Sequence, residues 1–195
     1  MKDVLDEYRK QFFLTEYMLF SVQAGLQTRN KNYPIYDKDK INVFSREKVY
    51  DTDNTSKLKY DLFDLLSEYL EEIKTKGINE EKHLQQIIKM SDRISELYQK
   101  FLFQNRFRIG ISQKIINLFL KYMWAADEIP EPCHCPVDGI VKSHIKNQLI
   151  NCNLPDWSKL DDINDYKQYI DCIREIAKRD NLSIAQWELF NWRRR

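Results

Sequence analysis

The sequence predicts an all-α protein, and three observations support this. Apolar residues recur at helical spacing over several long segments. Only 4 glycines and 5 prolines occur in 195 residues, too few for a β fold with many tight turns. The hydrophobic fraction is 43%, with 13% aromatic residues, which is enough apolar material for one core. We therefore expect a single domain over residues 1–195.

The first part of the chain contains two predicted helices separated by a polar segment. Residues 2–27 repeat apolar positions every three or four residues, which indicates an amphipathic helix. Residues 28–56 lose this period and are rich in polar residues, so we expect a loop there, with a short strand or turn at "INVF". Residues 57–76 form the next predicted helix, which ends at Gly77 because glycine is favoured just after a helix.

Two further helices are expected in the middle of the chain. Asn79 is a suitable N-cap for a helix that runs to about Asn105. In "RFRIGIS" that follows, Gly110 permits a backbone conformation that other residues resist. Ser112 is then the predicted N-cap of a helix from Gln113 to about residue 126.

Three helices are expected in the last part of the chain. Pro136 suits the first position of a helix over about residues 136–151. Another helix is predicted over about residues 162–179. Ser183, followed three residues later by Gln186, has the pattern of a capping box and starts the last helix.

The middle of the chain also contains a lysine and an aspartate that suggest chemistry. Lys114 would be the second residue of its helix, where the positive end of the helix dipole disfavours a protonated amine. An apolar setting would act in the same direction, and a neutral lysine is the nucleophile that Schiff-base chemistry requires. Asp138 would be the third residue of its helix, where an ionised carboxylate is favoured and can stabilise positive charge on a sugar.

Each of these two residues also has an ordinary interpretation. Lysine is common in the first turn of a surface helix, and aspartate is favoured near any helix N-terminus. From spacing alone, the ordinary interpretation is the more frequent one.

The segments "RIGISQKIINLFLKYMW" and "CPVDGIVKSHI" together resemble the helix-hairpin-helix-GPD superfamily of DNA glycosylases. The Gln-Lys dipeptide in the first segment is most similar to the archaeal 8-oxoguanine DNA glycosylase (AGOG) branch. The resemblance implies a two-lobed helical fold, with the helix-hairpin-helix at about residues 84–126 and the Pro-Val-Asp helix at about 136–151. It also implies that Lys114 is the Schiff-base lysine and Asp138 the catalytic aspartate.

The resemblance implies a DNA base-excision enzyme with associated AP-lyase activity that acts on double-stranded DNA. It also suggests 8-oxoguanine as the excised base. The DNA-binding hairpin would consist of Arg108, Ile109, Gly110, Ile111, Ser112 and Gln113. The usual Leu-Pro-Gly-Val-Gly hairpin is absent, because "RFRIGIS" has one glycine and no proline. The four clustered cysteines of an iron–sulfur cluster are also absent, so we expect no cofactor.

A base-excision enzyme needs a pocket for the flipped base, and such pockets usually offer aromatic faces. The four tryptophans are candidates, with core packing as the alternative role for each. The predicted base-pocket residues are Trp124, His134 and Trp187.

The cysteines do not predict a metal site. In "CHC" the two cysteines flank a single residue, His134, whereas a structural zinc site normally uses a wider pair and a second pair. Cys152 and Cys172 are isolated in the sequence. We expect no metal and, in a reducing compartment, four free thiols. His83 lies among polar residues and is expected at the surface.

Composition limits the location and partners of the protein. The formal net charge of +1 argues against a strongly basic surface, although residues 101–126 contain four basic and no acidic residues. The sequence has no apolar run of membrane-spanning length, and its start has acidic residues where a signal peptide would be basic and apolar. We therefore expect a cytoplasmic monomer, nucleoid-associated by function, that binds no membrane. Two alternatives stay open: a glycosylase for a hypermodified base in phage DNA, acting in anti-phage defence, and a non-enzymatic helical module that binds DNA or protein.

Overall fold

The computed structural model describes residues 2–37, 39–40, 51–149 and 153–192. Over these residues the chain is all-α, with seven α-helices, two short 3₁₀ helices and no strand. An isolated bridge pairs Tyr36 with Leu102. No helix in the described part of the chain combines the length and apolar character that crossing a bilayer requires.

The first three helices lie close to where the sequence predicts them. They are α1 (Lys2–Gly25), α3 (Asp51–Lys76) and α4 (Glu80–Tyr98). Gly77 has a φ of 74° and so ends α3 as expected, and the Asn79 side chain accepts a hydrogen bond from the Lys82 N–H at 3.1 Å.

Two details of this region differ from prediction. Helix α3 begins at Asp51, inside the segment predicted as a loop. Helix α4 ends at Tyr98 instead of Asn105, and the chain then turns through positive φ values at Gln104 and Asn105. The strand or turn expected at "INVF" lies outside the described residues.

The later elements are a 3₁₀ turn η1 (Phe103–Asn105), α5 (Ile109–Ala125), α6 (Gly139–Gln148), a 3₁₀ turn η2 (Trp157–Lys159), α7 (Ile163–Arg179) and α8 (Ile184–Asn191). The capping box at Ser183 and Gln186 is present, which confirms the predicted start of α8. The starts of α5 and α6 differ from prediction, and both differences affect the candidate site.

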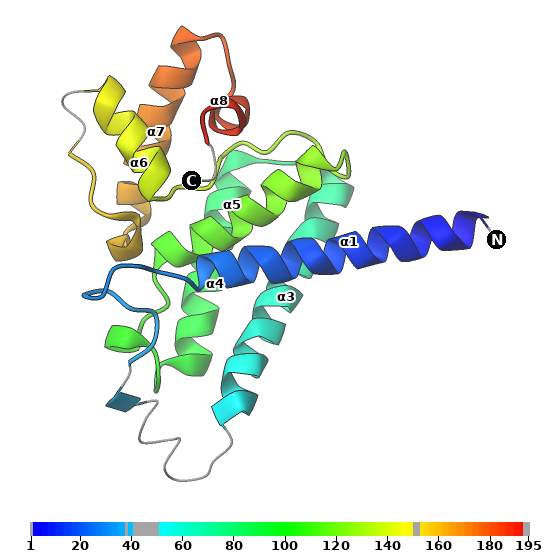
Figure 1. Cartoon of the computed structure of the whole chain (residues 1–195), viewed down its shortest axis with the longest axis vertical. Coiled ribbons are helices and arrows are strands. Elements are labelled where there is room, and N and C mark those ends of the chain that lie inside the picture. The colour runs from blue at the N-terminus through cyan, green and yellow to red at the C-terminus, as the bar shows by residue number, and fades with distance from the viewer. Residues whose placement is uncertain (1, 38, 41–50, 150–152, 193–195) are drawn as a thin grey trace.

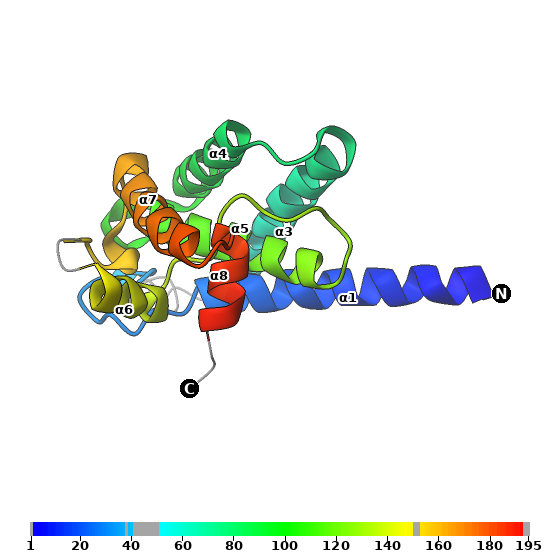
Figure 2. The same ribbon diagram turned by 90° about the horizontal axis from the view of Figure 1, so that it is seen from above.

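Helix α5 is central to the arrangement. It packs against α1, α4, α7 and η2. Helices α1, α3 and α4 form one group around it, whereas α6 and α7 lie at the end opposite to the free start of α1 (Figure 1). Viewed from above, α8 lies across the region between α5 and α7 (Figure 2). The N-terminal end of α5 is therefore the place where both groups of helices approach each other.

A glycine allows α1 to lie close to α5. A Cβ added at Gly25 would lie 2.1 Å from Cγ1 of Ile115, much closer than van der Waals contact. The last turn of α1 is thereby held against the first turns of α5. This contact brings a carbonyl at the end of α1 within reach of Lys114.

The two halves of α1 differ in burial. Met18 and Val22 are buried, as expected for the apolar face of an amphipathic helix. The first half projects beyond the rest of the molecule and exposes apolar side chains (Figures 1 and 2). These are Val4, Leu5, Tyr8, Phe12 and Phe13.

Candidate active site

Helix α5 begins earlier than predicted. Its first residue is Ile109 and its N-cap is Arg108, which makes no side-chain cap hydrogen bond. Ser112, the predicted N-cap, is instead a buried residue of the first turn, and its Oγ makes no hydrogen bond. Lys114 is consequently the sixth helical residue and not the second, so the dipole of its own helix acts on it less than expected.

Contacts with a distant segment explain this early start. The Gly110 N–H donates to the Leu160 carbonyl at 2.9 Å, and the Ile109 N–H donates to Oδ1 of Asp161 at 3.3 Å. A Cβ at Gly110 would lie 1.8 Å from the Trp157 carbonyl oxygen. The expectation of an unusual backbone at Gly110 is wrong, because the residue is helical. Glycine is needed there for close approach.

The predicted DNA-binding hairpin is a buried segment. Arg108 is 3% exposed, and burial lowers its pKa. Its Nε donates to the Ser158 carbonyl at 2.7 Å, and its Nη2 donates to the carbonyls of Tyr33 and Pro34. The five residues after it in the predicted hairpin are also buried, namely Ile109, Gly110, Ile111, Ser112 and Gln113. The side chains of this segment therefore hold the fold together, and contact with DNA stays a prediction.

Lys114 lies at the meeting point of α1, α5 and η2. Its Nζ donates to the Ala24 carbonyl at 2.9 Å and lies 4.3 Å from the centre of the Trp157 ring. Burial lowers the pKa of Lys114, whereas the negative charge of Asp138 raises it. The net direction is downward, which makes the neutral amine more accessible than in an exposed lysine.

Asp138 is the N-cap of α6, which starts at Gly139. Oδ1 accepts hydrogen bonds from the N–H groups of Ile140 at 2.8 Å and Val141 at 3.0 Å. Oδ2 accepts from Nε1 of Trp192 at 3.3 Å. The prediction that α6 begins at Pro136, with Asp138 as its third residue, is wrong, because the first helical residue is Gly139. The helix start is therefore set by the Asp138 cap and not by Pro136.

Gln113 connects the segments that carry Lys114 and Asp138. Its Nε2 donates to the carbonyl of Val137 at 2.7 Å, and its Oε1 accepts from the Val137 N–H at 3.0 Å. This fully buried pair of hydrogen bonds fixes the residue before Asp138 against the first turns of α5. Gln113 thus fixes the segment of Asp138 against the turn of α5 that carries Lys114.

The three predicted base-pocket residues lie apart. Trp187 is 1% exposed and packs in the core, with the His144 ring 6.2 Å away between centroids. Trp124 is ten residues beyond Lys114 on α5, which corresponds to about 15 Å along the helix axis. His134 is buried between Tyr166 and Glu80. None of the three lines the hollow beside Cys133 and Arg174 or the hollow beside Leu14 and Tyr17.

Two other tryptophans lie at the site. Trp157 lies against the Lys114 ammonium, and Trp192 donates to Asp138. Lys121 lies 5.0 Å from the centre of the Trp192 ring and forms an ion pair with Glu188 at 2.7 Å. No local signal separates these tryptophans from Trp124 and Trp187, because the contacts join residues more than 40 positions apart. The sequence alone therefore gives no basis for choosing Trp124 and Trp187 over Trp157 and Trp192.

Comparison with known proteins gives no assignment. No protein family, no curated protein and no solved structure matches this chain. The geometry of Lys114, Asp138 and the two tryptophans is therefore the basis for any functional proposal.

Proposed function

We propose that the protein is a DNA base-excision enzyme with associated AP-lyase activity. Lys114 is its nucleophile and Asp138 its catalytic carboxylate. In this proposal the arrangement of α4, α5 and α6 corresponds to the helix-hairpin-helix and Pro-Val-Asp helix of a two-lobed glycosylase fold. The partner is double-stranded DNA, and no cofactor enters the scheme.

One observation carries the proposal. Lys114 is a half-buried lysine with a lowered pKa, and the nearby charge that acts on it is Asp138. The two residues are 24 positions apart, yet the Gln113–Val137 hydrogen bonds hold their segments together. Surface lysines and ordinary helix caps do not require such an arrangement, whereas amine chemistry at a sugar carbon does.

The neighbouring groups support the same roles. The Asp138 carboxylate is held by two backbone N–H groups and one indole, so its orientation is fixed. The Lys114 amine lies on the face of Trp157, an apolar surface that disfavours water around it. Both groups are thus held in place by the fold before any substrate binds.

The reaction follows from these roles. The neutral Nζ of Lys114 attacks C1′ of the nucleotide, the C1′–N bond breaks and the base leaves with a proton. Asp138 stabilises positive charge on the sugar while this bond breaks. The C1′–O4′ bond of the sugar ring then breaks, a proton moves from Nζ to O4′, and the C1′=Nζ double bond of a Schiff base forms. Removal of a C2′ proton then expels the 3′ phosphate and cleaves the strand.

The resemblance of "RIGISQKIINLFLKYMW" to the archaeal 8-oxoguanine branch suggests 8-oxoguanine as the excised base. A hypermodified base in phage DNA would use the same two residues. The two substrates are separated by measuring base release from duplexes that carry each modification.

The test is reductive trapping. We expect the wild-type protein, incubated with sodium borohydride and a duplex containing 8-oxoguanine or an abasic site, to form a covalent adduct. Lys114→Gln should abolish the adduct with both duplexes, and Asp138→Asn should abolish it with the 8-oxoguanine duplex. Lys142→Gln is the matched control, because Lys142 is paired with Asp156 at 2.7 Å and has no role in the scheme.

Each result has a defined meaning. An adduct with the abasic duplex alone would keep the lyase role of Lys114 and assign the enzyme to another base. An adduct that persists in Lys114→Gln would assign the chemistry to a different residue. If no adduct forms and DNA still binds, the Schiff-base mechanism is wrong, and a non-enzymatic DNA-binding module becomes the better description.

A further inference from the structure

A second cluster of reactive side chains lies apart from the Lys114–Asp138 pair. It consists of His83 on α4 together with Cys133 and His134 in the loop before α6. One ring nitrogen of each histidine and the Cys133 sulfur all lie within 4.8 Å of one another. The histidine rings meet edge to face, with centroids 4.9 Å apart. Histidine nitrogen and cysteine sulfur are the donors that zinc prefers.

His83 is buried, contrary to the surface position predicted for it. Burial lowers the pKa of the His83 ring to about 3. Its Nδ1 is 3.0 Å from the Tyr69 hydroxyl, but its Nε2 forms no hydrogen bond of normal geometry. The Asn117 side chain lies close enough to act on the ring as a hydrogen-bond partner, which raises its pKa, but the contact does not have normal hydrogen-bond geometry. A buried ring nitrogen with so poorly aligned a partner can exchange that partner for a metal ion.

The two histidines have matching surroundings. The Tyr69 hydroxyl lies 3.0 Å from Nδ1 of His83, and the Tyr166 hydroxyl lies 3.0 Å from Nδ1 of His134. Metal-binding histidines commonly donate one ring N–H to such a group while the other nitrogen binds the metal. In both rings Nε2 is therefore the nitrogen to consider as the metal ligand. Nε2 of His134 lies 3.0 Å from Oε1 of Glu80, an exposed carboxylate, so zinc would have to displace this contact.

We propose that His83, Cys133 and His134 form a zinc site, with Nε2 of each histidine and Sγ of the cysteine as ligands. Tetrahedral zinc places two nitrogens about 3.3 Å apart and a nitrogen and a sulfur about 3.6 Å apart. One nitrogen of each ring and the Cys133 sulfur lie within 4.8 Å of one another, so the donor atoms must move closer together to bind zinc. Cys133 lies in a loop, which makes such an adjustment easy.

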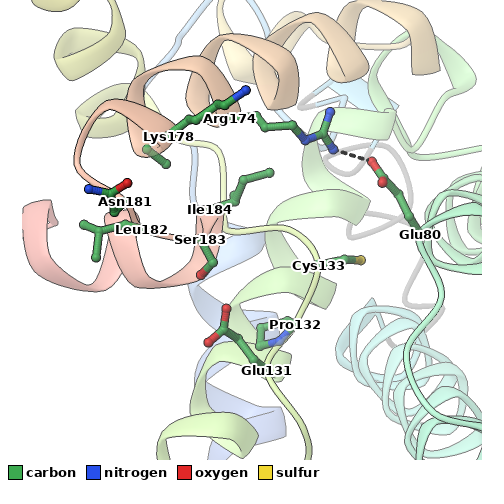
Figure 3. Close-up of a pocket in the computed structure, with 11 residues that line it drawn as sticks. Glu80, Glu131, Pro132, Cys133, Arg174, Lys178, Asn181, Leu182, Ser183 and Ile184 are labelled. Atoms are coloured by element: carbon green, nitrogen blue, oxygen red, sulfur yellow. Dashed lines mark hydrogen bonds and ion pairs between the residues drawn. The ribbon is translucent and has the colours of Figure 1, made fainter.

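Of the three proposed ligands, Cys133 lines an open hollow. This hollow has a volume of about 510 Å³, and its lining includes Cys133, Glu80 and Arg174. Figure 3 shows the Cys133 side chain directed toward the α4 side of the hollow, where Glu80 is held by Arg174. Water from the hollow fills the fourth position, and the hollow provides the path by which zinc enters.

The cysteines differ in ways that matter for the test. Cys133 and Cys135 are free thiols, whereas Cys172 is disulfide-bonded, so the expectation of free thiols is wrong for Cys172. Cys152 lies outside the described residues. Cys135 is fully buried and does not belong to the cluster. Cys135→Ser is therefore a matched control for Cys133→Ser.

The site is independent of the proposed function. Zinc would tie α4 to the loop that leads into Asp138, but it takes no part in the chemistry of Lys114. Lys114→Gln should bind zinc like the wild-type protein. Failure of the trapping test would leave the zinc proposal intact, and failure of the zinc test would leave the glycosylase proposal intact.

The experiment uses cobalt(II) as a spectroscopic probe and then zinc. We expect the full chain, stripped with a chelator, to bind one equivalent of Co²⁺ with a thiolate charge-transfer band that Zn²⁺ abolishes. Cys133→Ser should lose this band and bind Zn²⁺ about tenfold or more weakly, whereas Cys135→Ser should keep both properties. Far-UV circular dichroism checks that each variant is folded.

A second measurement avoids any substitution. Zn²⁺ should protect Cys133 of the wild-type protein from alkylation by iodoacetamide, as mapped by mass spectrometry. Absence of a thiolate band together with unprotected Cys133 would overturn the proposal. A band that survives in folded Cys133→Ser would also overturn it, because the metal would then bind elsewhere.

Discussion

The starts of α5 and α6 supply the two halves of the candidate site, but they are built differently. Helix α6 begins with a local signal: the Asp138 side chain caps its own helix. Helix α5 has no side-chain cap, and its first N–H groups bind Leu160 and Asp161, 50 or more residues away. Gly110 is closely packed, whereas Gly139 at the start of α6 has no atom within 4 Å of its Cβ position. One helix start is determined by neighbours in sequence and the other by neighbours in space.

The largest expected effect tests this difference directly. Gly110→Ala places a methyl group 1.8 Å from the Trp157 carbonyl oxygen, so the backbone must move. We expect a loss of roughly 3 kcal/mol or more in the free energy of unfolding. The measurement is denaturant unfolding followed by circular dichroism.

The matched substitution is Gly139→Ala. It meets open space at a helix start, so the free energy of unfolding should stay within about 1 kcal/mol of wild type, on the stabilising side. Equal losses in the two variants would show that the close approach at Gly110 does not hold the start of α5.

An intermediate effect is expected at Asp138. Asp138→Ala removes the hydrogen bonds to the N–H groups of Ile140 and Val141, which should cost about 1 kcal/mol of unfolding free energy. Asp138→Asn keeps a capping oxygen and should be nearly as stable as wild type, although we expect it to lose base excision. The same loss of stability in both variants would argue against a local cap.

The smallest effect concerns the electrostatic link between the two helix starts. Adduct formation with an abasic duplex requires neutral Lys114, so its rate should rise with pH, with a midpoint below the ordinary lysine pKa of 10.5. The charge of Asp138 raises the pKa of Lys114, so Asp138→Asn should move this midpoint to lower pH. Initial trapping rates across neutral and mildly alkaline pH give the comparison. An unchanged midpoint would mean that the two residues do not interact.

Local signals in the sequence predict most of the fold. Asn79, Gly77 and the Ser183–Gln186 capping box mark helix boundaries that the structure confirms, because their effects act within a few residues. Ser112 has the same chemistry but is not a cap, because tertiary contacts start α5 before it. Boundaries set by such contacts cannot be read from neighbouring residues.

Some residues of the candidate site can likewise be predicted from the sequence, whereas others depend on long-range contacts. Lys114 and Asp138 are visible in the sequence as residue types near helix starts, and the structure brings their segments together through Gln113. The roles of Trp157 and Trp192 depend on long-range contacts and have no local pattern. His83 was missed for a related reason: polar residues surround it in sequence, yet its own side chain faces the interior of the fold.

Arg108 has a consequence for the order of folding. Its guanidinium joins the carbonyl of Tyr33, 75 residues earlier, to that of Ser158, 50 residues later. These bonds join segments that are far apart in the sequence and close two long loops, so we expect them to form late in folding. Contacts that form after the transition state slow unfolding without accelerating folding. We therefore expect the Arg108 hydrogen bonds to slow unfolding and so to lengthen the lifetime of the folded protein.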